Sequence, residues 1–207
     1  MGDRIYPIGI QNFEKIRKEG YVYVDKTALM YKLVKSGSYY FLSRPRRFGK
    51  SLLISTLEAY FEAKRDLFEG LAVETLEKDW VKRPVFHLDL NIGKYDTPDS
   101  LDKILNETLD YWESLYGTRS AETTLALRFA GVVGRAYEQS GERVAILIDE
   151  YDKPLLQAIG NEELQREFRN TLKPFYGVLK TMDGCIKFAL LTGVTKFGKV
   201  SVFSDLN

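Results

Sequence analysis

Short apolar runs alternate with long amphipathic segments along this chain, and this alternation constrains the fold more than any other feature. The runs cover residues 39–43, 84–90, 144–148 and 186–191. Their length and their content of β-branched, aromatic and leucine residues are typical of buried strands. Strands that are separated by helices favour a parallel sheet covered on both faces, so we predict an α/β fold.

The spacing of apolar residues between these runs predicts where the helices lie. One helix is expected at 26–35, with Asp25 as its cap, Leu29 among its inward residues and Gly37 at its end. Further helices are expected from about residue 50 and at about 97–116, 121–139 and 162–181. Pro174 is expected to kink the last of these helices.

The amino-terminal part of the chain is less regular than the rest. The first 20 residues look like an arm or a short helix, and residues 21–24 form a short β-prone run. We therefore expect two parts: an amino-terminal arm and helix over residues 1–36, and a core over residues 37–207. The length of 207 residues fits one ordinary domain with a small extension.

Composition excludes several classes of protein. A single cysteine, Cys185, allows no internal disulfide, and we interpret this as a sign of a reducing compartment, the cytoplasm. We expect no signal peptide and no membrane span. Thirty basic and 29 acidic residues give a net charge of +1, which predicts no global attraction to nucleic acid. One histidine, His87, and one cysteine exclude a Cys/His zinc cluster.

A basic segment between a predicted strand and a predicted helix resembles a phosphate-binding loop. Gly49, Lys50 and Ser51 match the end of the pattern glycine, four residues, Gly-Lys-Ser/Thr, whereas Arg44 stands where the first glycine is expected. Backbone N–H groups at a helix start bind phosphate, the lysine reaches the outer phosphates, and the hydroxyl holds Mg²⁺. The alternative is an ordinary strand–turn–helix junction. The residues expected to contact a nucleotide are Arg46, Arg47, Phe48, Gly49, Lys50, Ser51 and Leu52.

Two acids follow the apolar run 144–148. Since ligands of parallel sheets lie beyond the carboxyl ends of the strands, Asp149 is expected to bind Mg²⁺ together with Ser51. Glu150 is expected to polarise a water for attack on the γ-phosphate. The alternative is an acidic loop that merely caps a strand. Asp152 is interpreted as a helix cap in preference to a group that supports the metal ligands.

Thr192 follows the last apolar run and is expected at the same edge of the sheet. Its hydroxyl would hydrogen-bond the attacking water or the γ-phosphate, although Thr192-Gly193 also fits a plain strand end and turn. Lys196 and Lys199 come next, and nothing in the sequence fixes either of them near the phosphates. The catalytic candidates are therefore Lys50, Glu150 and Thr192.

These motifs together resemble the bacterial AAA-ATPase-like domain family. The resemblance covers nearly the whole chain and rests on residues 25–27, 44–51, 147–152, 191–196 and 202–204. In that family an arginine at the position of Arg44 is usual. The resemblance implies a P-loop NTPase fold: a three-layer α/β/α sandwich with a mostly parallel sheet. It also implies the additional-strand (AAA/ASCE) type, in which one strand lies between the P-loop strand and the strand before Asp149.

The resemblance also implies ATP and Mg²⁺ as ligands. Gly49, Lys50 and Ser51 would be the Walker A residues, Asp149 and Glu150 the Walker B pair, and Thr192 the sensor. Family members are usually longer, often with a carboxyl-terminal nuclease-like domain of the PD-(D/E)XK type. This chain is therefore expected to be truncated before the lid region. No residue is assigned as an arginine finger or a second sensor.

Three functions fit this sequence. The leading hypothesis is an ATPase whose hydrolysis drives a conformational change in a larger protein, with action on nucleic acid and oligomerisation both compatible. The second is a nucleotide-binding regulatory switch with little intrinsic hydrolysis. The third, a small-molecule kinase, needs a phosphate-acceptor pocket that the sequence does not locate.

Overall fold

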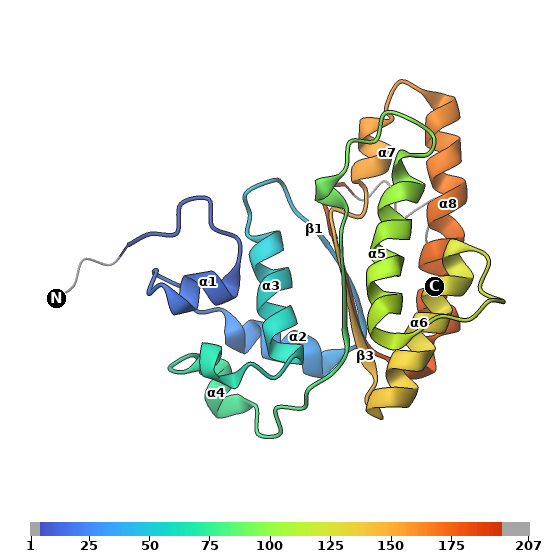
Figure 1. Ribbon diagram of the computed structural model, residues 1–207. Helices are drawn as coiled ribbons and strands as arrows, with labels where there is room; N and C mark the ends of the chain where they lie inside the picture. Colours follow the sequence, from blue (N-terminus) through green and yellow to red (C-terminus); the bar gives the residue numbers. More distant parts are fainter. Residues whose placement is uncertain (1–4, 196–207) are drawn as a thin grey trace.

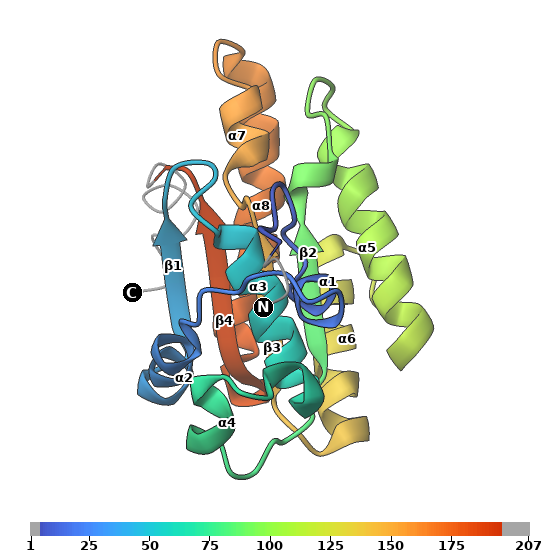
Figure 2. The same ribbon diagram turned by 90° about the vertical axis from the view of Figure 1, so that its left-hand side faces the viewer.

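The computed structural model describes residues 5–195 and contains one parallel sheet. Its strands are β1 (Tyr39–Ser43), β2 (Val85–Asp89), β3 (Val144–Asp149) and β4 (Ile186–Gly193). The strand order is β1-β4-β3-β2, and every neighbouring pair is parallel (Figure 2). Because β4 lies between β1 and β3, the predicted additional strand is confirmed. All four strands that the sequence predicts are present.

Helices cover both faces of this sheet. Figure 1 shows α1 to α4 on one side and α5 to α8 on the other. The helices are α1 (Phe13–Lys18), α2 (Thr27–Ser36), α3 (Lys50–Phe61), α4 (Ala72–Leu76), α5 (Ser100–Tyr116), α6 (Leu125–Ser140), α7 (Lys153–Gln157) and α8 (Glu162–Thr181). The predicted three-layer α/β/α architecture is therefore confirmed. Among the described residues, no helix is both long enough and apolar enough to cross a membrane.

The central strand β3 shows how the two layers are built. All six of its residues are buried. Ala145 and Leu147 belong to the hydrophobic cluster that contains α1, α2 and α3, whereas Ile146 and Ile148 belong to the cluster beneath α5, α6 and α8. A strand buried on both faces needs apolar residues at every position, which explains why 144–148 is continuously apolar.

The structure corrects several details of the prediction near the amino terminus. Residues 21–24, a β-prone run in the sequence, form no strand. Asp25 lies one residue before the N-cap position of α2, and its carboxylate accepts hydrogen bonds from the Thr27 N–H (2.8 Å) and the Ala72 N–H (2.8 Å). Leu29, expected to point inward, is 69% exposed.

The strands end together at one edge of the sheet. The register pairs Leu42 with Thr192 and Ile148 with Leu191. The segments that follow β1, β3 and β4 therefore meet at this carboxyl edge, as the sequence predicts. Lys196, Lys199 and residues 202–204 lie outside the described residues.

Candidate nucleotide site

The segment after β1 turns sharply into α3 and leaves the start of this helix open. Gly49 is the N-cap residue of α3 and has a φ of 75°, and Arg47 has a φ of 66°. A Cβ on Gly49 would meet no atom within 4 Å, so the backbone conformation, and not space, favours glycine there. Helix α3 has 12 residues, and the first N–H groups of a helix have no partner within it. This geometry suits an anion.

Lys50, the first residue of α3, folds back over its own loop. Its side chain is only 3% exposed. The Nζ atom donates hydrogen bonds to the Arg44 carbonyl (3.1 Å) and the Pro45 carbonyl (3.4 Å), and it lies 3.1 Å from Glu150 Oε1. Residues of the loop after β1 and the loop after β3 are thus brought into direct contact.

The two acidic side chains after β3, Asp149 and Glu150, contact different partners. Asp149 is 3% exposed, and its Oδ1 accepts hydrogen bonds from the Thr192 hydroxyl and from the Glu150 N–H (3.1 Å). Glu150 has a φ of 55°, a conformation that is strained for a residue with a side chain. This conformation lets consecutive residues serve different partners: Asp149 contacts Thr192, and Glu150 contacts Lys50.

A cleft of about 660 Å³, here called the phosphate cleft, lies over the start of α3. Its walls include most of the residues that the sequence predicts for nucleotide contact and two of the three catalytic candidates, Lys50 and Glu150. These are Arg46, Arg47, Gly49, Lys50, Ser51, Leu52 and Glu150. Asp149 and Thr192 are buried behind Glu150, which contacts both: its N–H also lies 3.4 Å from Thr192 Oγ1. Phe48 borders a neighbouring cleft instead.

Two parts of the phosphate cleft were not predicted. Residues 8–11 of the amino-terminal arm form one wall, and Asn91, just after β2, forms another part. The arm is fixed there because the Ser55 hydroxyl of α3 donates to the Gln11 carbonyl (2.9 Å). Neither segment carries a sequence pattern that indicates a ligand, so only the tertiary structure identifies them.

Asp152 occupies the N-cap position of α7, where the sequence predicts a helix cap, but its side chain makes no cap hydrogen bond. Its carboxylate is buried and accepts hydrogen bonds from the Val194 N–H (3.0 Å), the Thr195 N–H (2.7 Å) and the Thr195 hydroxyl (2.8 Å). Asp152 thereby fixes the chain that follows β4 to the loop that follows β3.

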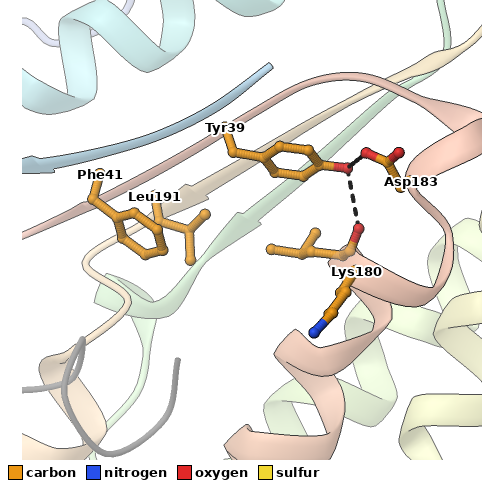
Figure 3. A pocket seen from close by; sticks show the side chains of 6 residues that line it. Tyr39, Phe41, Lys180, Asp183 and Leu191 are labelled. Atoms are coloured by element: carbon orange, nitrogen blue, oxygen red, sulfur yellow. Dashed lines mark hydrogen bonds between the residues drawn. The ribbon is translucent and has the colours of Figure 1, made fainter. Parts of the chain in front are cut away.

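A smaller pocket of about 320 Å³ lies beside the edge strand β1 (Figure 3). The Tyr39 hydroxyl donates to Asp183 Oδ1 (2.7 Å) and lies 3.1 Å from the Leu179 carbonyl. Burial and the Asp183 carboxylate raise the pKa of Tyr39. Tyr39 and Asp183 already satisfy each other, so this pocket is a weaker candidate than the phosphate cleft.

Two oxygen donors at or beside the phosphate cleft are of the kind that Mg²⁺ prefers. The Ser51 hydroxyl belongs to a residue that lines the cleft, whereas the Asp149 carboxylate is buried behind Glu150. The lysine at the helix start suits the phosphates. A parallel sheet with one strand between the loop strand and the acidic strand, combined with these residues, defines the class: a P-loop NTPase-like domain.

Comparison with known proteins agrees with this class. The family model described as Predicted AAA-ATPase matches residues 7–203, and the chain belongs to this AAA-ATPase-like family. It is 42% identical over 209 residues to an uncharacterized protein in the vnfD 5' region of Azotobacter chroococcum mcd 1. This alignment covers all of the chain but only 40% of that relative. No solved structure matches the chain.

Proposed function

We propose that this domain binds ATP with Mg²⁺ in the phosphate cleft and hydrolyses the ATP to drive a conformational change in a larger protein. The observation that carries the proposal is the meeting of Lys50 Nζ and Glu150 Oε1, 3.1 Å apart, beside the open start of α3. A lysine that binds the phosphates and a residue that activates or orients the nucleophile recur in P-loop enzymes that transfer phosphoryl groups.

Binding requires Lys50 to change partners. Its ammonium would leave Glu150 and the loop carbonyls for the outer phosphates, while the N–H groups at the start of α3 hold the others. Arg46 and Arg47 line the same cleft, and a guanidinium suits phosphate. Ser51 and Asp149 would hold Mg²⁺, which supplies neutralisation of the phosphate charge when bound.

Hydrolysis assigns a separate role to Glu150. Once Lys50 turns to the phosphates, the Glu150 carboxylate is released to accept a proton from the attacking water. The φ of 55° at Glu150 directs its side chain to the cleft while Asp149 stays on Thr192. In this proposal Thr192 orients Asp149. The role predicted from the sequence is different, because there the Thr192 hydroxyl contacts the attacking water or the γ-phosphate directly.

Glu150→Gln tests the assignment. Phosphate release is expected to fall by about 10²–10⁴-fold, the usual contribution of a general base. ATP is expected to bind at least as tightly, because a neutral amide competes less for Lys50. Glu142→Gln, at a partly exposed ion pair with Arg83, is the matched control and should leave both measurements unchanged. Unchanged turnover in Glu150→Gln with normal ATP binding would exclude Glu150 as the base.

A nucleotide-binding switch with little hydrolysis is the second candidate, and one observation favours it. Lys50 holds the Glu150 carboxylate in an ion pair. If this ion pair persists after nucleotide binding, Glu150 cannot activate the attacking water. Phosphate release measured on a longer protein that contains this domain, with and without DNA, separates the two. Fast release contradicts the switch, and stable ATP occupancy without release contradicts the ATPase.

We also propose a context for this domain within a longer protein. The relative extends well beyond the aligned region, which leaves room for a carboxyl-terminal nuclease-like domain. Action on nucleic acid and assembly into an oligomer would then depend on parts outside the described residues. A single cysteine, Cys185, supports a location in the cytoplasm.

A further inference from the structure

A second cleft adjoins the phosphate cleft, and its chemistry differs. It has a volume of about 620 Å³ and lies between the amino-terminal arm, α2 and α3; we call it the apolar cleft. Its walls include Tyr6, Pro7, Val24, Leu29 and Phe48. Volumes of 300–1,000 Å³ with mainly apolar walls are typical of small-molecule sites.

We propose that the apolar cleft binds the base and ribose of the nucleotide whose phosphates occupy the phosphate cleft. This inference rests on the proposed ATP binding and adds the part of the ligand that the Lys50 loop does not explain. The two clefts share Gly49 and Leu52 in their walls. A ligand with its phosphates at Lys50 therefore passes directly over Gly49 into the apolar cleft.

Exposed apolar side chains gather around this second cleft. Tyr6 is 73% exposed, Val24 72%, Leu29 69% and Phe48 66%. Exposed apolar groups that cluster at a hollow mark a binding surface, whereas scattered ones need no explanation. Aromatic rings such as those of Tyr6 and Phe48 stack on the π-face of a base. Contact with the nucleoside thus explains the exposure of Leu29, which the sequence did not predict.

Hydrogen bonds hold the walls of the apolar cleft in place. The Val22 N–H donates to the Ile5 carbonyl (2.9 Å), which holds the arm beside the segment before α2. The Phe13 N–H donates to the Ser55 hydroxyl (3.0 Å), which holds the arm on α3. A cleft that exists before the ligand arrives loses less entropy on binding.

The test compares ATP with inorganic tripolyphosphate, both with Mg²⁺, by titration calorimetry on the 207-residue chain. The wild type is expected to bind ATP at least tenfold more tightly than tripolyphosphate. Phe48→Ala is expected to weaken ATP binding by about 5- to 100-fold, the range that base stacking on an aromatic ring contributes. Leu29→Ala, which removes an apolar contact, is expected to weaken ATP binding by a smaller factor, and both variants should leave tripolyphosphate binding unchanged. Leu115→Ala, at a 54% exposed leucine of α5, is the matched control and should change neither affinity.

The outcomes separate this inference from the proposed function. Equal affinity of the wild type for ATP and tripolyphosphate overturns the apolar cleft as the nucleoside site and leaves phosphate binding intact. The same conclusion follows if Leu29→Ala and Phe48→Ala weaken both ligands by the same factor. If neither ligand binds, or if Lys50→Ala has no effect on either, the nucleotide site itself is refuted.

Discussion

Two buried ion pairs in this domain are alike in burial and unlike in surroundings. In the Lys50–Glu150 pair the side chains are 3% and 14% exposed, and in the Arg135–Glu122 pair they are 9% and 11% exposed. The first pair borders the phosphate cleft. The second lies where α6 packs against the segment before it, and a Cβ added at Gly131 would be 2.0 Å from Glu122 Oε1.

Burial of charge alone therefore does not identify a functional site. Lys50 bonds to one carboxylate and two carbonyls beside an open volume, so a phosphate could replace any of these partners. Arg135 also donates from Nε to the Tyr116 carbonyl (3.2 Å). It lines none of the clefts described above, so no space for another ligand adjoins it there. We regard the first pair as exchangeable and the second as structural. The following changes test that distinction.

Removal of the structural carboxylate has the largest expected effect. Glu122→Ala leaves Arg135 buried without its acid, which typically costs about 3–5 kcal/mol. For a domain of this size that lowers the melting temperature by roughly 10 °C. Thermal unfolding measures the change. Glu163→Ala is the control, because its pair with Arg166 is 78% and 67% exposed and should contribute under about 1 kcal/mol. Equal effects of the two substitutions would mean that Arg135–Glu122 is not a structural pair.

Removal of the exchangeable cation should act on binding more than on folding. Lys50→Ala deletes a charged donor to phosphate, a loss of about 1.5–3 kcal/mol, so ATP affinity should fall roughly 10- to 100-fold. Unfolding should change less than in Glu122→Ala, because solvent in the cleft reaches Glu150. Lys64→Ala, at a surface lysine that pairs with Glu14 and Glu62, should leave ATP affinity unchanged. The distinction fails if Lys50→Ala binds ATP normally or unfolds as readily as Glu122→Ala.

The approach of Lys50 to Glu150 could be predicted from the sequence, whereas the pairing of Arg135 with Glu122 could not. Lys50 and Glu150 each lie in a segment that follows a strand, and parallel strands end at one edge, so local pattern and topology together predict their approach. Arg135 and Glu122 both lie within the segment 121–139 that the sequence predicts as a helix, and no periodicity distinguishes them from solvated charges. Only the packing of α6 determines which helix charges become buried.

The same reasoning explains what else the sequence missed. The strand pattern predicted the sheet and its carboxyl edge because each strand signal is local. The wall formed by residues 8–11 depends on a long-range bond from Ser55 to the Gln11 carbonyl, which no local pattern encodes. Leu29 was assigned to the core because helical periodicity marks apolar residues without showing which of them line a cleft.

Two glycines of α6 sharpen the contrast further. Gly131→Ala places a methyl group against the Glu122 carboxylate and should destabilise the domain by about 1–3 kcal/mol. Gly134→Ala meets only Met182 Cε, at an ordinary 3.5 Å, and should be neutral or stabilise the helix by up to about 1 kcal/mol. Chemical denaturation of both variants measures the difference. If Gly131→Ala is as stable as Gly134→Ala, the packing around Glu122 is looser than described.

A third ion pair, Lys35–Glu77, is intermediate in exposure, and its expected effect is confined to acidic pH. Lys35 is 47% exposed, whereas Glu77 is 6% exposed and also accepts a hydrogen bond from the Tyr60 hydroxyl. Burial by itself raises the pKa of Glu77, but the hydrogen bonds from Tyr60 and Lys35 outweigh it and lower the pKa from 4.5 to about 2.

A lowered pKa means that the folded state favours the ionised carboxylate. The stability that Glu77 contributes is therefore present above about pH 4.5 and is lost as the pH falls toward 2. The free energy of unfolding of the wild type should decrease more steeply over this range than that of Glu77→Gln, which has no proton to bind. Glu163→Gln, at an exposed pair, should follow the wild type. If the curves of the wild type and Glu77→Gln are parallel, the ion pair with the exposed Lys35 does not stabilise the Glu77 carboxylate. Solvent would then screen Glu77 as it screens a surface carboxylate.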